Sequence, residues 1–486
     1  MRLSLFLAAL LLPAAVAAVA AVAAVAAEDD DIAARFDALA AQLASAAFEE
    51  RAAAVRRLEA LAWEHADVAR ARLPALIAGA RDVDVRQRLE AARAMASGGR
   101  WRALPEAPIA TRYHDARVVL PDGRLLIWGG FSFLDRKPKL YADGAIFDPK
   151  TLTWTKIAEA PIAARAGATA LRIGERVFVV GGTRRIWAAL DDDAPRDAAW
   201  YDPAKDVWTK APDVPLPELN ESTVAVTDDG RPLQFGAVQG AEGWKGAILD
   251  VTKNAWRSIP ECPFKWRDEP VLAVAGRHLL VWGGSDRDGE RRNGGAIWDA
   301  KTGEWSALDE APVLGRSGAA AVVVDGKLIV LGGRGKGWRG ALADGVQIST
   351  AGTVNPIDAA IHPVFRALRL DRVVLATDLE HASILDPTSL RWSPPIIEGK
   401  GEAVLHAGMV GGNALLLVSD GTARRFDLRR FRWLPTAKAP DDALRHVPTF
   451  LPGGLFLWGG GDTPMSGRLS PGRMFDGGWW YQPPPK

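Results

Sequence analysis

The stretch RLLIWGG, residues 124–130, ends an apolar run with a pair of glycines, and this ending returns along the chain. A glycine pair seen once would mark a bulge or a turn, whereas a recurring pair indicates an internal repeat. The copies are RVFVVGG at 176–182, RPLQFGA at 231–237, HLLVWGG at 278–284, KLIVLGG at 327–333, and the weaker RVVLAT at 372–377, LLLVSD at 415–420 and LFLWGGG at 455–461. The first glycine or its equivalent advances by about 47 residues per copy, which predicts a repeat architecture.

A second element follows each glycine pair and ends in tryptophan. The segment AIFDPKTLTW ends at Trp154, and its pattern predicts a strand, a turn at Asp-Pro and a second strand. A third, proline-containing element such as AEAPIAAR at 158–165 comes next. In the fifth copy Val354 stands where tryptophan is expected. The equivalent tryptophans of the other copies are Trp208, Trp256, Trp305, Trp392, Trp433 and either Trp479 or Trp480.

This order of elements resembles the kelch repeat, and the resemblance extends from about residue 101 to residue 481. It implies an all-β propeller built from four-stranded blades. The glycine pairs would let backbones approach closely, and each tryptophan would pack between neighbouring blades. Eight repeats are counted, and seven or six blades stay possible because kelch propellers more often have these numbers. The ring is expected to close by bringing residues 100–104 near residues 477–481, with either terminus able to supply the outermost strand.

The N-terminal region divides into two further segments. Residues 1–27 carry Arg2 and then an Ala-rich apolar run, which predicts a cleaved signal peptide, with an uncleaved anchor as the alternative. Residues 28–98 show apolar positions at helical spacing and resemble a HEAT-type helical repeat pair. Residues 99–486 form the expected propeller. We therefore expect an exported protein of bacterial type, which is periplasmic, envelope-associated or extracellular, with no membrane span after the signal.

Composition limits the classes of partner. The chain of 486 residues has 60 Lys and Arg against 59 Asp and Glu, which gives no argument for nucleic acid or for a membrane surface as a partner. The single Cys262 excludes an internal disulfide and is expected to be a buried, inert thiol. The seven histidines show no metal-ligand spacing, so neither a metal nor another cofactor is expected. The oligomeric state is left open.

An arginine follows the proline element in several copies. In kelch domains that bind acidic peptides, arginines at this position line the binding mouth, so the resemblance implies a ring of guanidinium groups that face an anionic ligand. The alternative is that each arginine pairs with an acidic residue of a neighbouring blade. The candidates are Arg112, Arg165, Arg267, Arg316 and Arg445, with Arg366 as a looser match, and Glu218, Glu221, His114 and His446 are expected at the same face.

Charged loops after the glycine pairs supply further candidates. Trp187, Trp338 and Arg334 lie in such loops, and exposed tryptophans are typical of recognition sites. The preferred hypothesis is a non-catalytic scaffold that binds a protein or an acidic glycan or peptide on one face. The alternative is a carbohydrate-active enzyme, a sialic-acid-type isomerase or lyase, that uses arginine and glutamate in the channel. A purely structural envelope protein is the third possibility.

Overall fold

The computed structural model describes residues 27–134, 137–184, 195–238, 243–335, 340–399, 402–460 and 477–485. Residues 1–26 of the expected signal peptide, Trp187 and Trp338 lie outside these ranges. The chain divides into two compact units. The helical unit comprises Met1–Arg102, Arg429–Lys438 and Tyr481–Lys486, and the propeller unit comprises Ala103–Leu428 and Ala439–Trp480.

The helical unit packs its helices around a small apolar core. Residues 27–42 are helical, and α2 (Phe48–Glu64), α3 (Ala66–Gly79) and α4 (Val83–Gly98) follow. The α4 helix begins after Asp82, whose carboxylate accepts from the backbone N–H groups of the next turn. Phe36, Leu58 and Leu89 are among the buried residues of the core. None of the helices among the described residues is both long and apolar enough to cross a membrane.

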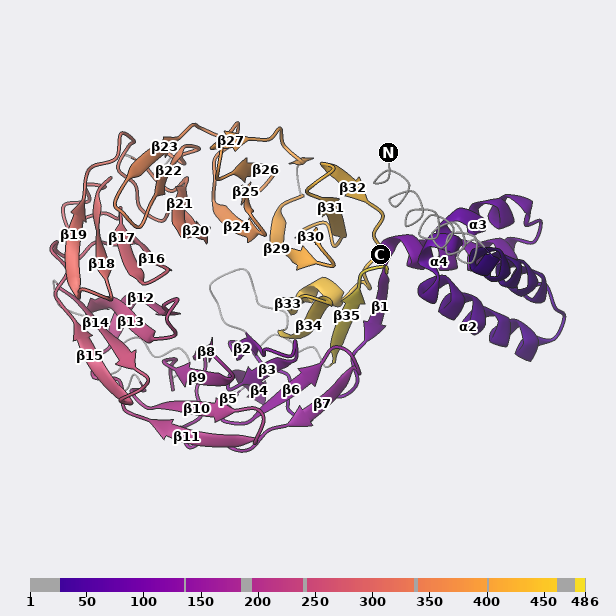
Figure 1. The fold of residues 1–486 in the computed structure, drawn as a ribbon, viewed down its shortest axis with the longest axis horizontal. Helices are drawn as coiled ribbons and strands as arrows, with labels where there is room; N and C mark the ends of the chain where they lie inside the picture. Colours follow the sequence, from indigo (N-terminus) through magenta and orange to yellow (C-terminus); the bar gives the residue numbers. More distant parts are fainter. Residues whose placement is uncertain are drawn as a thin grey trace, which may run out of the picture. The chain divides into compact units, whose positions relative to one another are not determined.

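The repeats form eight sheets, which Figure 1 shows following one another round a ring in chain order. The expected blade count of eight is therefore confirmed. Blade one consists of β2 (Ala116–Val119), β3 (Leu125–Trp128), β6 (Gly144–Asp148) and β7 (Thr153–Lys156), and blade two of β8 (Thr169–Ile173), β9 (Arg176–Val180), β10 (Ala198–Asp202) and β11 (Val207–Ala211). Blade three consists of β12 (Leu219–Val226), β13 (Pro232–Val238), β14 (Trp244–Asp250) and β15 (Ala255–Ile259). Blade four consists of β16 (Val271–Ala275), β17 (His278–Trp282), β18 (Gly295–Asp299) and β19 (Glu304–Leu308).

The later blades keep this pattern. Blade five consists of β20 (Ala320–Val324), β21 (Lys327–Leu331), β22 (Gly345–Ile348) and β23 (Val354–Ile357). Blade six consists of β24 (Arg366–Leu370), β25 (Val373–Thr377), β26 (His381–Asp386) and β27 (Arg391–Trp392), and β28 (Ile397–Glu398) also pairs with β26. Blade seven consists of β29 (Val404–Val410), β30 (Asn413–Val418), β31 (Ala423–Asp427) and β32 (Arg432–Leu434), and blade eight of β33 (His446–Leu451), β34 (Gly454–Gly460), β35 (Gly478–Gln482) and β1 (Arg100–Ala103). The hairpin β4 (Phe131–Leu134) and β5 (Lys137–Leu140) extends a loop of blade one, and the 3-10 turn η1 (Ala443–Arg445) precedes β33.

The ring closes in the last blade with strands from both ends of the chain. The sheet order is β1-β35-β34-β33, so the N-terminal strand is the outermost one. Next to this pairing, Leu104 N donates to Gly478 O at 2.9 Å. The expected approach of residues 100–104 to residues 477–481 is therefore present, and the choice of terminus, which the sequence left open, is settled.

Apolar layers between neighbouring blades hold the propeller unit together. In one such layer Trp128 of blade one packs with Val177 and Tyr201 of blade two. In five blades the tryptophan of the outer strand also forms a hydrogen bond to the blade before it: its Nε1 donates to a carbonyl just past that blade's outer strand. These bonds run from Trp154 to Pro105 (3.2 Å), from Trp208 to Ala158 (2.9 Å), from Trp256 to Pro212 (2.9 Å), from Trp305 to Pro260 (2.9 Å) and from Trp392 to Asp358 (2.8 Å).

The second glycine of each pair is required by its backbone. Gly130 has φ of +94°, and a Cβ atom built there would lie 2.7 Å from the carbonyl oxygen of Tyr113. Gly333 repeats this geometry, with φ of +88° and Ser317 O at 2.9 Å. A side chain would therefore meet both a strained conformation and a backbone clash.

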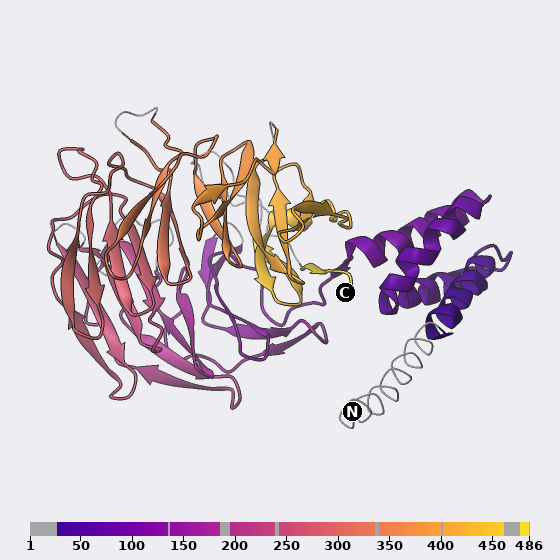
Figure 2. The ribbon, with the colours of Figure 1, turned by 45° about the horizontal axis from the view of Figure 1, so that its top comes forward.

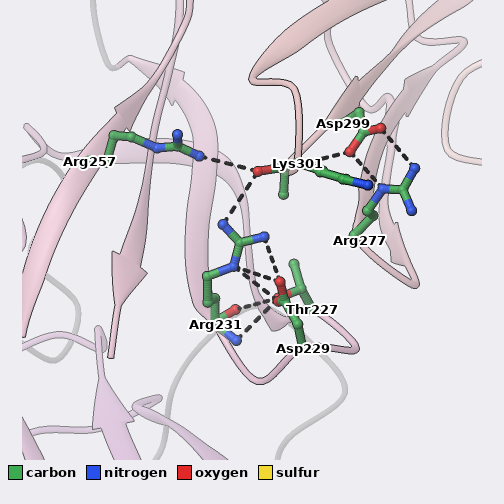
Figure 3. A network of polar contacts seen from close by, with 8 residues as sticks. Thr227, Asp229, Arg231, Arg257, Arg277, Asp299 and Lys301 are labelled. Atoms are coloured by element: carbon green, nitrogen blue, oxygen red, sulfur yellow. Dashed lines mark hydrogen bonds and ion pairs between the residues drawn. The ribbon is translucent and has the colours of Figure 1, made fainter. Parts of the chain in front are cut away.

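Two faces of the propeller carry different loops, and Figure 2 shows the strands running between them. Because each blade is antiparallel, the segment that enters the first strand and the loop between the second and third strands lie at the same face, here called the entry face. The tight turns lie at the opposite face. There, Arg231 Nη1 and Arg257 Nη2 of blade three donate to Ala300 O of blade four at 3.3 and 3.2 Å (Figure 3).

Candidate ligand-binding site on the entry face

In three blades, a buried arginine at the entry face forms hydrogen bonds that connect two segments of the same blade. Arg316 Nη1 donates to Gly332 O at 3.1 Å and to Asp344 O at 2.9 Å, and its Nη2 lies 3.0 Å from Asp344 Oδ1. The Arg316 side chain is fully buried. The guanidinium group therefore joins the glycine pair to the start of the third strand within one blade. Arg112 with Gly129 and Asp143, and Arg165 with Gly181 and Asp197, repeat these contacts.

The backbone of the same arginines joins neighbouring blades. The carbonyl oxygen of Arg316 accepts from Gly284 N of the preceding blade at 2.8 Å. The carbonyl of Arg165 accepts from Gly130 N at 2.8 Å, and that of Arg112 closes the ring by accepting from Gly460 N at 3.2 Å. The expected ring of ligand-facing arginines is corrected at these three positions, because their guanidinium groups are buried in blade-forming contacts. Their partners are acidic residues of the same blade, not of the neighbour.

Blades six and eight depart from the arginine pattern. Val364, not Arg366, takes the place of Arg316, since its carbonyl oxygen approaches Gly332 of the preceding blade. Arg366 is exposed and donates to Leu405 O at 2.8 Å. In blade eight, Arg445 is exposed, and the buried His446 takes over the contact to the glycine pair. Its Nδ1 lies 3.0 Å from Gly459 O, and burial lowers the pKa of its imidazole.

Arg267 in blade four keeps the arginine but lacks its carboxylate. Its Nη1 donates to Gly283 O at 3.0 Å and to Gly294 O at 2.8 Å, as in the three blades with a buried arginine. Gly294 stands where Asp344 stands in blade five, so this position supplies no carboxylate to the guanidinium group. Within the described residues no carboxylate pairs with Arg267, and the side chain is only half-buried. Desolvation, and secondly the positive charge of Arg292, lower its pKa.

A cavity of about 440 Å³ opens beside Arg267. Its wall combines four cationic and two acidic side chains with two aromatic rings, from the segment that enters β16 and the loop after β17. The Arg267 guanidinium lies over the Phe264 ring, 4.0 Å from the centroid. Asp286 is engaged by Arg292, whose Nε donates at 3.0 Å, and this bond first of all lowers the pKa of Asp286. We call this cavity the blade-four pocket; its lining is Phe264, Lys265, Trp266, Arg267, Asp286, Arg287, Asp288 and Arg292.

The other expected site residues are dispersed over the entry face. Glu218 is half-buried and lines a separate cavity of about 300 Å³ with Arg196. Glu221 lies in β12, and its side chain is not among those described. The exposed His114 stacks on Phe131 with ring centroids 5.7 Å apart. Arg334 pairs with Glu269 of blade four and so links two blades.

Sequence reasoning did not single out the blade-four pocket. A difference at one repeat position could have indicated the pocket. The residue before the third strand is Asp143, Asp197 and Asp344 in blades one, two and five, whereas it is Gly294 in blade four. The loop with Asp286 and Asp288 is one of the charged loops after the glycine pairs, and the sequence did not connect it with Arg267. Among the described residues, no cluster of three or more His, Cys, Asp or Glu side chains is placed to hold a metal ion.

These repeats, glycine pairs and interblade tryptophans define a β-propeller with eight blades. The family described as Kelch motif matches residues 164–215. A relative named N-acetylneuraminate epimerase, from Pasteurella multocida (strain Pm70), is 23% identical over 233 residues. The match covers 40% of this chain and 61% of the length of that relative. A solved structure titled "Structure of YjhT" is 15% identical in sequence and superposes with a TM-score of 0.38. The aligned region covers 60% of this chain and 99% of the chain of that structure.

Proposed function

We propose that the protein is a non-catalytic binding module that takes a carboxylate-bearing ligand, a protein, peptide or acidic glycan, in the blade-four pocket. One observation carries the proposal: Arg267 has the backbone contacts of a structural arginine and lacks the carboxylate that occupies its equivalents. A ligand carboxylate can take that vacant place, because a guanidinium group offers a planar fork that matches carboxylate geometry.

The rest of the pocket supports an anionic ligand. Lys265, Arg287 and Arg292 line the cavity with Arg267, so the lining has four cationic side chains beside the two acidic ones, Asp286 and Asp288. Phe264 and Trp266 offer apolar faces beside the cations. Such a site combines charge attraction with a rigid aromatic surface, which is typical of recognition sites. Export through a signal peptide remains an expectation from the sequence.

The test is isothermal titration of the protein with glucuronate, N-acetylneuraminate and acidic peptides. The Arg267→Gln variant is expected to lose binding by about tenfold or more, since a charge-assisted bond contributes roughly 1.5–3 kcal/mol. Arg391→Gln is the matched control, because Arg391 is an exposed arginine on the outer strand β27. Equal binding by the wild type and Arg267→Gln would refute the proposal. Raised salt is expected to weaken binding.

The second candidate is a carbohydrate-active enzyme of the sialic-acid isomerase or lyase type. The relative's name supports it, together with Glu218 and Arg196 in one cavity, where a carboxylate could act as proton acceptor beside an anion-binding cation. Proton NMR of N-acetylneuraminate incubated with the protein in D₂O tests this alternative. Turnover that Glu218→Gln abolishes would favour the enzyme. An unchanged spectrum would remove the second candidate.

A further inference from the structure

Large apolar side chains are exposed together on the entry face of blades six and seven. Ile361, Phe365, Leu379 and Leu405 are 71, 50, 68 and 36% exposed. Ile361 and Phe365 lie in the segment that enters β24, Leu379 lies in the loop after β25, and Leu405 lies near the start of β29. We call these four residues the apolar patch. Exposed apolar residues that gather on one face mark interaction sites more often than scattered ones do.

Backbone contacts bring the members of the patch close to one another. Phe365 N donates to Thr377 O at 2.9 Å, which places Phe365 beside the strand end that leads into Leu379. Arg366 Nη1 donates to Leu405 O at 2.8 Å and ties blade seven to the residue after Phe365. The patch therefore continues across the boundary between the two blades.

Polar contacts among buried and half-buried side chains hold the loops of the patch in place. The imidazole rings of His362 and His381 stack with centroids 5.4 Å apart, and His381 Nδ1 lies 3.0 Å from Asp378 Oδ2. His362 Nε2 lies 3.0 Å from Ser383 Oγ. His362 follows Ile361 in the chain, and Asp378 precedes Leu379. The patch is therefore presented by fixed loops, which lowers the entropic cost of binding.

The apolar patch and the blade-four pocket lie on the same face of the propeller. Leu314, 66% exposed, occupies the segment that enters blade five, between the two. Its neighbour Gly315 packs on the pocket loop, since a Cβ built there would lie 2.0 Å from Arg291 O. The entry face thus passes from a cationic cavity to exposed apolar side chains over blades four to seven.

We propose that the ligand is a polypeptide segment that places an acidic side chain in the blade-four pocket and bulky apolar side chains on Leu314 and the apolar patch. This inference rests on the proposed function and narrows its ligand class. Charge complementarity fixes the acidic end of the segment, because the pocket lining is predominantly cationic. A sugar acid would fill the pocket and leave the apolar residues without an apolar partner.

Panning a random dodecapeptide library on the full chain tests the proposal, followed by fluorescence polarisation with the enriched peptides. The peptides are expected to combine Asp or Glu with Leu, Ile or Phe. Both Phe365→Ser and Arg267→Gln are expected to weaken their binding by about tenfold or more. Val207→Ser is the matched control, because Val207 is 50% exposed in the outer strand of blade two. Thermal melting confirms that each variant is folded.

The outcomes separate this inference from the proposed function. Peptides that need Arg267 and ignore Phe365 would overturn the inference and leave the carboxylate site standing, as would an absence of enriched peptides together with sugar-acid binding that needs Arg267. Peptides that need Phe365 and ignore Arg267 would overturn both. Analytical ultracentrifugation covers a second copy as the occupant: a dimer that Phe365→Ser dissociates would also overturn the inference.

Discussion

Arg267 Nη1 donates to the carbonyl oxygen of Gly294 at 2.8 Å, and Gly294 brings no carboxylate with that oxygen. At the same place in blade five, Asp344 gives Arg316 both its carbonyl oxygen and its carboxylate. One side chain therefore distinguishes an arginine that has a carboxylate partner from one that has none among the described residues. The contrast leads directly to a substitution that should close the site.

Gly294→Asp is expected to abolish carboxylate binding in the blade-four pocket and to keep the fold. The residue has space for a side chain, since the nearest atoms to an added Cβ are Leu308 O at 3.5 Å and Glu310 Cγ at 3.6 Å. The new carboxylate would pair with Arg267 and leave stability within about 1 kcal/mol, because such pairs nearly balance their desolvation. Titration with the ligands named above measures the loss. Gly294→Ala is the control and should bind as the wild type does.

Asp344→Ala is expected to destabilise the propeller by about 3–5 kcal/mol, because it leaves the fully buried Arg316 without its counter-ion. Arg267→Gln should cost far less, since this side chain is half-buried and no described carboxylate would lose its partner. Urea denaturation of both variants measures the difference. Similar losses in the two would contradict the division into structural and ligand-facing arginines.

Acid should weaken the ion pair between Asp299 and Arg277, which lies among the tight turns of blade four at the face opposite the entry face. The hydrogen bond from Arg277 lowers the pKa of Asp299 to about 2, below its ordinary value of 3.8. A carboxylate with a depressed pKa in the folded state contributes stability above its unfolded pKa and loses it as the pH falls through the folded value. The contribution should therefore disappear between about pH 4 and pH 2. Thermal melts over this range should show a smaller slope for Asp299→Asn than for the wild type.

Trp305→Phe should cost about 1 kcal/mol, because it removes the 2.9 Å hydrogen bond to Pro260 O while an aromatic ring remains. Trp305→Ala should cost about 3–5 kcal/mol, since the ring that packs 5.6 Å from Phe235 is lost as well. The fifth blade offers a comparison, because Val354 makes no such bond through its side chain. Val354→Ala should therefore cost less than Trp305→Ala in the same urea titration.

Native Cys262 should resist alkylation at pH 8. The side chain is buried, and burial raises the pKa of its thiol to about 12, so almost none of it is thiolate. Iodoacetamide with mass spectrometry is expected to modify it only after urea is added. Rapid labelling of the folded protein would show that the segment between β15 and β16, which contains Cys262, opens locally.

The repeat period predicted the propeller because it records a local requirement that each blade meets in the same way. Gly130 and Gly333 need positive φ and room for a neighbouring carbonyl, so glycine must return at this position. The outer-strand tryptophans return because each fills the wedge between two blades. The strand that closes the ring could not be chosen, since β1 and β35 are both compatible with the outer position in sequence.

The role of the arginines was less accessible. Recurrence after the proline element was compatible with a ligand-binding ring and with blade-forming contacts, and the partner lies 28 to 32 residues further along the chain, as Asp344 does from Arg316 or Asp197 from Arg165. Val364 and His446 further show that spacing to the proline element does not fix the structural position. The burial of each arginine side chain had to be known before blade-forming arginines could be distinguished from arginines that can contact a ligand.

The sequence by itself determined the architecture: eight repeats, four-stranded blades and a helical segment before them, because backbone conformation and apolar packing constrain residue types at a fixed period. The tertiary structure alone decided that Arg112, Arg165 and Arg316 are buried in blade-forming contacts and that Arg267 has no carboxylate partner among the described residues. It also brought Ile361, Phe365, Leu379 and Leu405 onto one face from three separate segments. Burial and proximity across blades arise only when the ring closes, and they leave no periodic trace in the chain.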